Sequence, residues 1–209
     1  MCHRDKKDLK GTNALKYIEW GEKQGFHKRP TCASRQRWWD LGEPPLSNFL
    51  WTMTYRERFF VAQNKIAYAD ARFYDMYSSD EIGAIANTSF CLFWMELQAR
   101  GYGGGGGPVD VKVYEVQNFE IPFVPQPLRE NLLTSFGQVA NREIKPIFTE
   151  LGINPAFPIR EQKPNPLPDR KALDDIVFDV LGLTEDERNE LYWAVCELVK
   201  NRLEKARSV

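Results

Sequence analysis

Two short stretches of the sequence, residues 35–38 and 56–65, bring basic, aromatic and amide side chains close together. A guanidinium or ammonium group can neutralise a phosphate, and an arginine can also donate two hydrogen bonds to the edge of a guanine. An asparagine amide can pair in a similar way with adenine. The candidates for this chemistry are Arg35, Arg37, Trp38, Arg56, Arg58, Asn64, Lys65 and Lys112. A structural role is the alternative for each, because arginines are usually solvated and tryptophans usually lie in the core.

Charge is distributed unevenly along the chain. The 209 residues carry a net charge of −1, which by itself does not indicate a nucleic-acid-binding protein. Residues 1–38, however, hold ten Lys or Arg against four Asp or Glu, whereas residues 160–209 hold nine against eleven. The basic N-terminal stretch is either a solvated segment or a face that suits phosphate contacts.

The composition predicts one domain with a helical appendage, since the chain is 43% hydrophobic and 13% aromatic. The polar start of the sequence does not resemble a signal peptide, and no run of eighteen apolar residues predicts a membrane span. The four cysteines are scattered without a C-x-x-C pair, which favours reduced thiols in a cytoplasmic protein. With two histidines and no clustered ligands, a structural zinc site is not expected.

The first part of the chain predicts a short helix within residues 11–25 and then several strands. Aromatic and β-branched residues favour strands at 35–41, 48–55, 59–64 and 72–77. On the first of these strands Trp38 and Trp39 would point to opposite sides, so one of the two rings would be exposed.

Residues 79–124 predict the unit around which the chain is organised. A long apolar helix is expected over residues 79–100, with Ser78 and Glu81 forming a capping box at its start. A glycine run ends this helix, and alternating valines predict a strand over residues 109–114. Pro122 and Pro125 then close the unit, because proline cannot donate to a central strand ladder.

The glycine run satisfies the G-x-G-x-x-G pattern at Gly101, Gly103 and Gly106. A phosphate-binding loop, however, needs a strand before it and a helix N-terminus after it. Here the order is reversed, so the run is expected to be a helix stop and connector. The alternative is a loop that lies close against another backbone, such as that of DNA.

Helices are expected again after Pro125. One amphipathic helix is expected over residues 128–142 and a further helical turn near Pro146, followed by a proline-rich, non-helical linker over residues 154–168. Two more helices should then form a hairpin. Asp169 is expected to cap the first and Gly182 to end it, and a Thr184–Glu187 capping box should start the second. This hairpin would pack on the domain or on a partner.

Several of these segments together resemble a known family. Phe93–Leu97, the glycine loop, Val109–Glu115 and Ile121–Pro125 are similar to the C-terminal target recognition region of adenine-N6 DNA methyltransferases. That family includes fused restriction–modification enzymes, and the layout is also similar to type I restriction specificity subunits. Upstream, Arg35–Glu43 resembles the R-x-x-W-Y-x-L strand with which the recognition region begins. The similarity extends over residues 11–125.

The catalytic motifs of such enzymes are not found in the sequence. Amino-group methylation needs an (Asn/Asp/Ser)-Pro-Pro-(Tyr/Phe) loop, and the near match at Asn154–Phe157 lacks the second proline. A nuclease of the Asp…Glu-x-Lys type is not matched either, because Lys200 lies one residue too far from Glu197. A serine or cysteine nucleophile would need a histidine base, and both histidines lie within the first 27 residues. The chain is therefore not expected to be an enzyme on its own.

The resulting prediction is an α+β fold in three parts. Residues 1–125 form a mixed β-sheet recognition domain with a long buried helix, residues 126–168 a helix and proline-rich linker, and residues 169–209 a C-terminal αα-hairpin.

The resemblance implies sequence-specific binding of double-stranded DNA. The cysteine pattern favours the cytoplasm, and no membrane partner is expected. The resemblance also implies that S-adenosylmethionine binds only to a separate methyltransferase or restriction catalytic domain or subunit. Two alternatives remain. One is a protein–protein adaptor that docks a partner through the C-terminal hairpin, and the other is an unrecognised enzyme.

Overall fold

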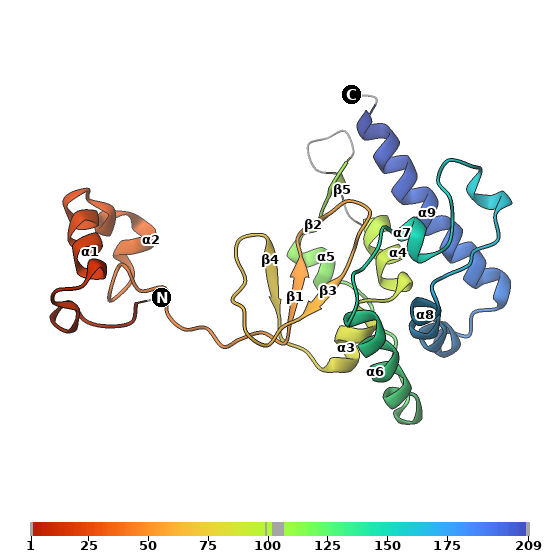
Figure 1. The fold of residues 1–209 in the computed structure, drawn as a ribbon, viewed down its shortest axis with the longest axis horizontal. Helices are drawn as coiled ribbons and strands as arrows, with labels where there is room; N and C mark the ends of the chain where they lie inside the picture. The colour runs from red at the N-terminus through yellow and green to blue at the C-terminus, as the bar shows by residue number, and fades with distance from the viewer. Residues whose placement is uncertain (1, 99, 102–106, 208–209) are drawn as a thin grey trace. The chain divides into compact units, whose positions relative to one another are not determined.

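The computed structural model describes residues 2–98, 100–101 and 107–207 and divides the chain into two units, Met1–Pro45 and Leu46–Val209. Figure 1 labels α1 to α9 and β1 to β5. The helical elements of the first unit are η1 (Lys6–Leu9), α1 (Asn13–Lys23), η2 (Phe26–Lys28) and α2 (Pro30–Ala33). The strands of the second are β1 (Phe49–Thr52), β2 (Thr54–Tyr55), β3 (Val61–Gln63), β4 (Phe73–Met76), β5 (Arg100–Gly101) and β6 (Val109–Asp110). Its helices are α3 (Asp80–Ile85), α4 (Ser89–Gln98), α5 (Val113–Gln117), α6 (Gln126–Ala140), α7 (Ile147–Glu150), η4 (Ile159–Glu161), α8 (Pro168–Leu181) and α9 (Glu185–Arg207).

The first unit contains the predicted short helix. The side chain of Thr12 caps α1 by accepting a hydrogen bond from the backbone N–H of Leu15, and Gly25, with a φ of 76°, turns the chain out of the helix. The strand predicted over residues 35–41 is wrong, because this segment forms bends and turns. Arg37 and Trp38 contact residues of the same unit there instead of pairing with a neighbouring strand.

The second unit holds two small antiparallel sheets. The first has the strand order β3-β1-β4, and Trp51 at its centre lies opposite Val61 on one side and Tyr74 on the other. The second sheet has the order β2-β6-β5. The strands predicted at 48–55, 59–64 and 72–77 are thus confirmed, with the first of them divided into β1 and β2.

The core of this unit forms where the first sheet meets α3 and α6. Phe49 and Trp51 point to the same side of β1 and are completely buried. The ring of Phe49 packs so closely on Gly83 of α3 that a Cβ atom at that glycine would lie 2.0 Å from the ring. It also lies 6.2 Å, between ring centroids, from Phe136 of α6. A glycine in α3 therefore allows the helix to approach the sheet.

The long helix predicted over residues 79–100 is wrong in one respect, because it is broken into α3 and α4. Asn87 lies at the break, and its side chain exchanges hydrogen bonds of 3.0 and 2.9 Å with the backbone N–H and C=O of Val61. Thr88 then starts α4 by accepting a hydrogen bond from the N–H of Cys91. The cap of α3 is Ser79, not Ser78 as predicted, and Ala99 lies outside the described residues.

The strand predicted over residues 109–114 is correct only for its first two residues. Glu115 accepts a 2.8 Å hydrogen bond from the backbone N–H of Lys112, which starts α5 at Val113. Val109 and Val111 are both completely or nearly completely buried. Their alternation with polar residues therefore reflects burial, although only Val109 lies in a strand. A local capping interaction thus overrides the β-type pattern.

The C-terminal helices pack on the rest of their own unit. Helix α8 lies mainly against α6, and α9 lies mainly against α4. Gly182 ends α8 with a φ of 71°, and the predicted Thr184–Glu187 capping box is confirmed. Asp169 does not cap α8, because Leu167 occupies that position and the Asp169 carboxylate binds Arg142.

The α+β class is confirmed, with small antiparallel sheets and a helical C-terminal part. The division between the two units lies at Pro45, whereas the sequence placed a boundary after Pro125.

A buried carboxylate joins α8 to α4 and α9. Asp174 is completely buried and accepts hydrogen bonds from the backbone N–H and hydroxyl of Ser89, both of 2.7 Å, and a longer one from the Tyr192 hydroxyl. Burial raises the pKa of Asp174, although the nearby positive charge of Arg170 and these hydrogen bonds oppose the shift.

We expect Asp174→Asn to change how stability depends on pH. Because the pKa of Asp174 is raised on folding, its contribution is complete below its unfolded pKa and is lost as the pH rises through the folded pKa. Asparagine cannot ionise. As the pH rises from 4 to 7, the unfolding free energy of the variant should therefore increase relative to that of the wild type, by about 1.4 kcal/mol for each unit by which folding raises the pKa of Asp174. Urea denaturation at the two pH values measures this. An identical difference in unfolding free energy at both pH values would contradict it.

Candidate nucleic-acid interface

The residues predicted to contact nucleic acid fall into three structural settings. In the first unit, Arg35 is exposed, whereas Arg37 and Trp38 are used inside the unit. The Arg37 guanidinium donates hydrogen bonds of 2.9 Å to Asp5 and 3.1 Å to Asp40. The indole N–H of Trp38 donates one of 3.2 Å to the Glu22 carboxylate. Both side chains therefore hold the first unit together.

Asn64 is buried and organises the loop between β3 and β4. Its Nδ2 donates hydrogen bonds to the carbonyls of Ser47 and Ala67, at 3.0 and 2.8 Å. Its Oδ1 accepts hydrogen bonds from the backbone N–H groups of Ile66 and Ala67, at 3.3 and 3.0 Å. These contacts use both donors and both lone pairs of the amide. The structure therefore leaves no group of Asn64 free to pair with adenine, contrary to the expectation from sequence.

The same contacts fix a loop tip that is strongly exposed. Lys65 is exposed, Ile66 has 90% of its surface accessible, and Tyr68 has 48% accessible. Ile66 thus stands at the tip of a loop whose backbone is held at its base by Asn64. Sequence reasoning found Lys65 but missed Ile66 and Tyr68. The signal available in the sequence was an apolar residue and a tyrosine in the connection between the strands predicted at 59–64 and 72–77.

The remaining three predicted residues lie at other edges of the second unit. Arg56 is exposed, and its backbone carbonyl accepts a 2.6 Å hydrogen bond from Arg202. Arg58 pairs with Glu143 at 3.0 Å, and both side chains are about half exposed. Lys112 pairs with Asp110, and that hydrogen bond raises the pKa of Lys112. The pair of Arg58 with Glu143, exposed on both sides, is weak enough to open for a competing phosphate.

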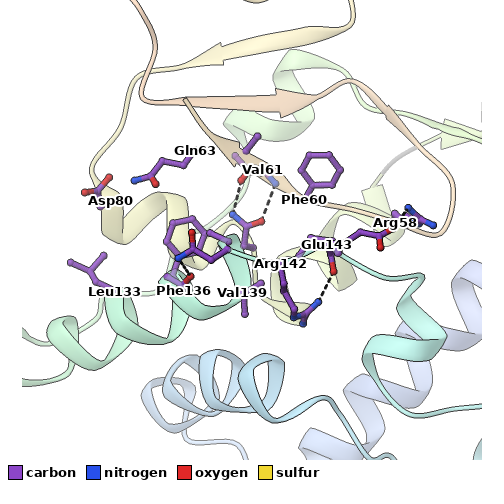
Figure 2. Close-up of a pocket in the computed structure, with 16 residues that line it drawn as sticks. Arg58, Phe60, Val61, Gln63, Asp80, Leu133, Phe136, Val139, Arg142 and Glu143 are labelled. Atoms are coloured by element: carbon purple, nitrogen blue, oxygen red, sulfur yellow. Dashed lines mark hydrogen bonds and ion pairs between the residues drawn. The ribbon is translucent and has the colours of Figure 1, made fainter. Parts of the chain in front are cut away.

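A groove of about 620 Å³ lies beside β3 and α6 (Figure 2). Its lining is largely apolar on the α6 side, where Leu133, Phe136 and Val139 contribute, and Arg58 and Glu143 pair within it. Asn87 also lines the groove, but its side-chain amide is already hydrogen-bonded to the backbone of Val61. The groove could hold an elongated apolar group, but its polar groups do not form a nucleophile with a base.

The glycine run does not form a phosphate cradle in the part that the structure describes. Gly101 belongs to β5 and Gly107 precedes β6, and these two strands pair antiparallel. Residues 102–106, and with them the predicted positions Gly103 and Gly106, lie outside the described residues. The run thus links two strands and is not followed by a helix N-terminus that could bind an anion.

Within the described ranges, His, Cys, Asp and Glu side chains form no cluster of three that could hold a metal ion. The helices described are also too short or too polar to cross a bilayer.

Comparison with known proteins gives a family match. Residues 2–147 match the family model of the C-terminal domain of the Type II methyltransferase M.Eco57I. Curated proteins and solved structures give no match. The matched range includes residues 2–45 of the first unit, both sheets of the second and helix α6, and it contains all the residues predicted for the site. Because it covers well over half of the chain, the protein belongs to the family of Type II methyltransferase M.Eco57I C-terminal domains.

Proposed function

We propose that this chain recognises a specific sequence in double-stranded DNA for a restriction–modification methyltransferase. A separate catalytic domain or subunit would bind S-adenosylmethionine and transfer the methyl group. The cytoplasm, where its four unpaired cysteines would stay reduced, is the compartment we propose. The observation that carries the proposal is the loop between β3 and β4, in which a buried Asn64 holds Lys65, Ile66 and Tyr68 exposed.

The chemistry of this loop suits a DNA groove. Lys65 supplies a positive charge for a phosphate, and among the described residues no carboxylate pairs with it. Ile66 and Tyr68 present an apolar surface that can enter a groove or press between base pairs. Because the backbone is held by side-chain hydrogen bonds at the base of the loop, little ordering entropy is lost on binding.

Duplex binding by the full chain tests this proposal. We expect the affinity, measured by fluorescence anisotropy, to fall with rising salt, because phosphate contacts release counterions. Lys65→Ala should weaken binding to all duplexes alike and reduce the slope of log affinity against log salt by about 0.9. Ile66→Ser should weaken binding without changing that slope.

The matched control is Lys171→Ala. Lys171 is also an exposed lysine, but it lies on α8 and pairs with Asp175. It should leave both affinity and salt slope unchanged. Binding that is independent of salt, or equal losses from Lys65→Ala and Lys171→Ala, would contradict the proposal.

The adaptor alternative is less well supported by the C-terminal helices. Several of their apolar side chains are already completely buried within the chain, namely Val177 and Phe178 of α8 and Val195 and Val199 of α9. A partner that docks on the apolar faces of these helices would have to displace α6 or α4. An adaptor would instead have to use the groove beside β3, which is lined by other elements.

A further inference from the structure

Helix α1 of the first unit presents a solvent face that the site described above does not include. Tyr17 and Trp20 lie three residues apart on it, with 63% and 47% of their surfaces exposed. Lys16 and Lys23 lie on the same side and are exposed. The opposite side of the helix is used for packing, because Ile18 is buried and Trp38 packs against Gly21. The exposed aromatic rings are therefore not needed for the core of the unit.

The rings on this face are arranged by contacts with one another. The centroids of Tyr17 and Trp20 are 5.5 Å apart, with their planes inclined by 32°. Trp20 in turn meets the edge of Phe26 in η2 at 5.4 Å. The guanidinium of Arg29 lies 4.5 Å from the centre of the Phe26 ring. This row of rings is formed before any ligand binds, so binding a planar partner would require little rearrangement.

Positive charges accompany the rings. Two basic residues of the first unit are neutralised internally, since Lys6 pairs with Glu22 and Arg37 with Asp5 and Asp40. Lys16, Lys23 and Lys28, by contrast, are exposed and pair with no carboxylate among the described residues. Lys16 and Lys23 thus add positive charge beside the exposed rings of α1.

We infer that the α1 face, defined by Lys16, Tyr17, Trp20, Lys23 and Phe26, binds unpaired nucleotides of single-stranded DNA. Aromatic rings stack on bases, and lysines beside them neutralise the phosphates of the same strand. In duplex DNA the faces of the bases are covered by their neighbours, so rings on a helix surface can stack only where bases are unpaired. The choice of DNA over another polyanion rests on the proposed function.

The test compares a short oligothymidylate with a duplex of random sequence, using the full chain and fluorescence anisotropy. Trp20→Ala should weaken binding of the single strand by about fivefold to 100-fold, because one stacked base is lost. Lys16→Ala combined with Lys23→Ala should lower the salt slope for the single strand by about 1.4. Circular dichroism should show unchanged helix content, since these side chains are exposed.

The matched control is Tyr114→Ala, which removes a comparably exposed aromatic ring, 48% accessible, from α5 in the second unit. It should leave single-strand binding unchanged. Equal losses from Trp20→Ala and Tyr114→Ala would overturn the inference, as would polyglutamate that competes as well as oligothymidylate.

The measurements on the single strand and on the duplex distinguish failure of this inference from failure of the proposed function. Duplex binding that depends on Lys65, without any binding of the single strand, would overturn the inference and leave the function standing. Single-strand binding that depends on Trp20, without duplex binding, would support the inference and count against the function. Binding of neither DNA would overturn both.

Discussion

Glu150→Ala is expected to lower the free energy of unfolding by about 3–5 kcal/mol, because it removes the shared partner of two arginines. The Glu150 side chain is 1% exposed. Its two oxygens accept hydrogen bonds of 2.7 and 2.8 Å from Arg142, one of 3.1 Å from Arg170 and one of 2.7 Å from the backbone N–H of Lys145. Without the carboxylate, the Arg170 guanidinium, only 5% exposed, would keep its charge in the interior without its ion pair to Glu150.

The effect should also depend on pH. Burial by itself would raise the pKa of Glu150, but the hydrogen bonds from Arg142 and the charge of Arg170 lower it below the ordinary value. The stability that the carboxylate contributes is therefore present above the unfolded pKa of about 4.3 and is lost as the pH falls through the folded pKa. The difference between wild type and Glu150→Ala should accordingly shrink in acid.

Chemical denaturation of the full chain measures this loss. The control is Glu190→Ala, because Glu190 also accepts two hydrogen bonds from an arginine, Arg160, but the two side chains are about half exposed. That exposed pair should contribute about 0–1 kcal/mol. Equal losses from the two substitutions would show that burial of Glu150 does not determine its importance.

The parts of the fold that could be predicted from sequence are those set by local interactions. The capping box of Thr184 and Glu187 lies within one turn, and the stop at Gly182 depends on that residue's own backbone. The break between α3 and α4 could not be predicted in this way. It depends on Asn87 bonding to Val61, a residue 26 positions earlier on the edge of a sheet.

At the candidate site, too, the partners of a side chain are determined by the fold. Residue type indicated that Arg37 and Asn64 could reach a nucleic acid, but only the fold shows which partners already occupy them. For Arg37 these are Asp5 and Asp40, and for Asn64 they are groups of its own loop. The exposure of a side chain could not be predicted from the sequence either. Ile66 was therefore missed, although it is the most exposed large apolar residue described. A spacing of three residues between Tyr17 and Trp20 was visible in the sequence, but it fits a core-facing stripe equally well.

Arg202→Ala is expected to cost about 3 kcal/mol, because this side chain joins α9 to three other segments of the second unit. Its guanidinium donates hydrogen bonds of 3.0 and 2.7 Å to the two oxygens of Glu96 on α4. It also donates to the carbonyls of Arg56 and Gly107, and it lies over the ring of Tyr55 at 5.7 Å. Its partner Glu96 is only 2% exposed, so the substitution would leave a buried carboxylate without its counter-charge.

Two further variants separate the geometry of Arg202 from its charge. Arg202→Lys keeps the charge but cannot reproduce a planar fork that bonds to two carboxylate oxygens and two carbonyls, so it should recover only part of the loss. Lys200→Ala, two residues earlier on α9, removes a lysine whose partner carboxylate, Glu204, is 3.9 Å distant and exposed. It should change stability by no more than a few tenths of a kcal/mol. Thermal and urea unfolding of the three variants measure these differences. Full recovery of stability by Arg202→Lys would show that charge alone suffices. A loss of stability from Lys200→Ala as large as that from Arg202→Ala would mean that α9 is held by its overall charge and not by this contact.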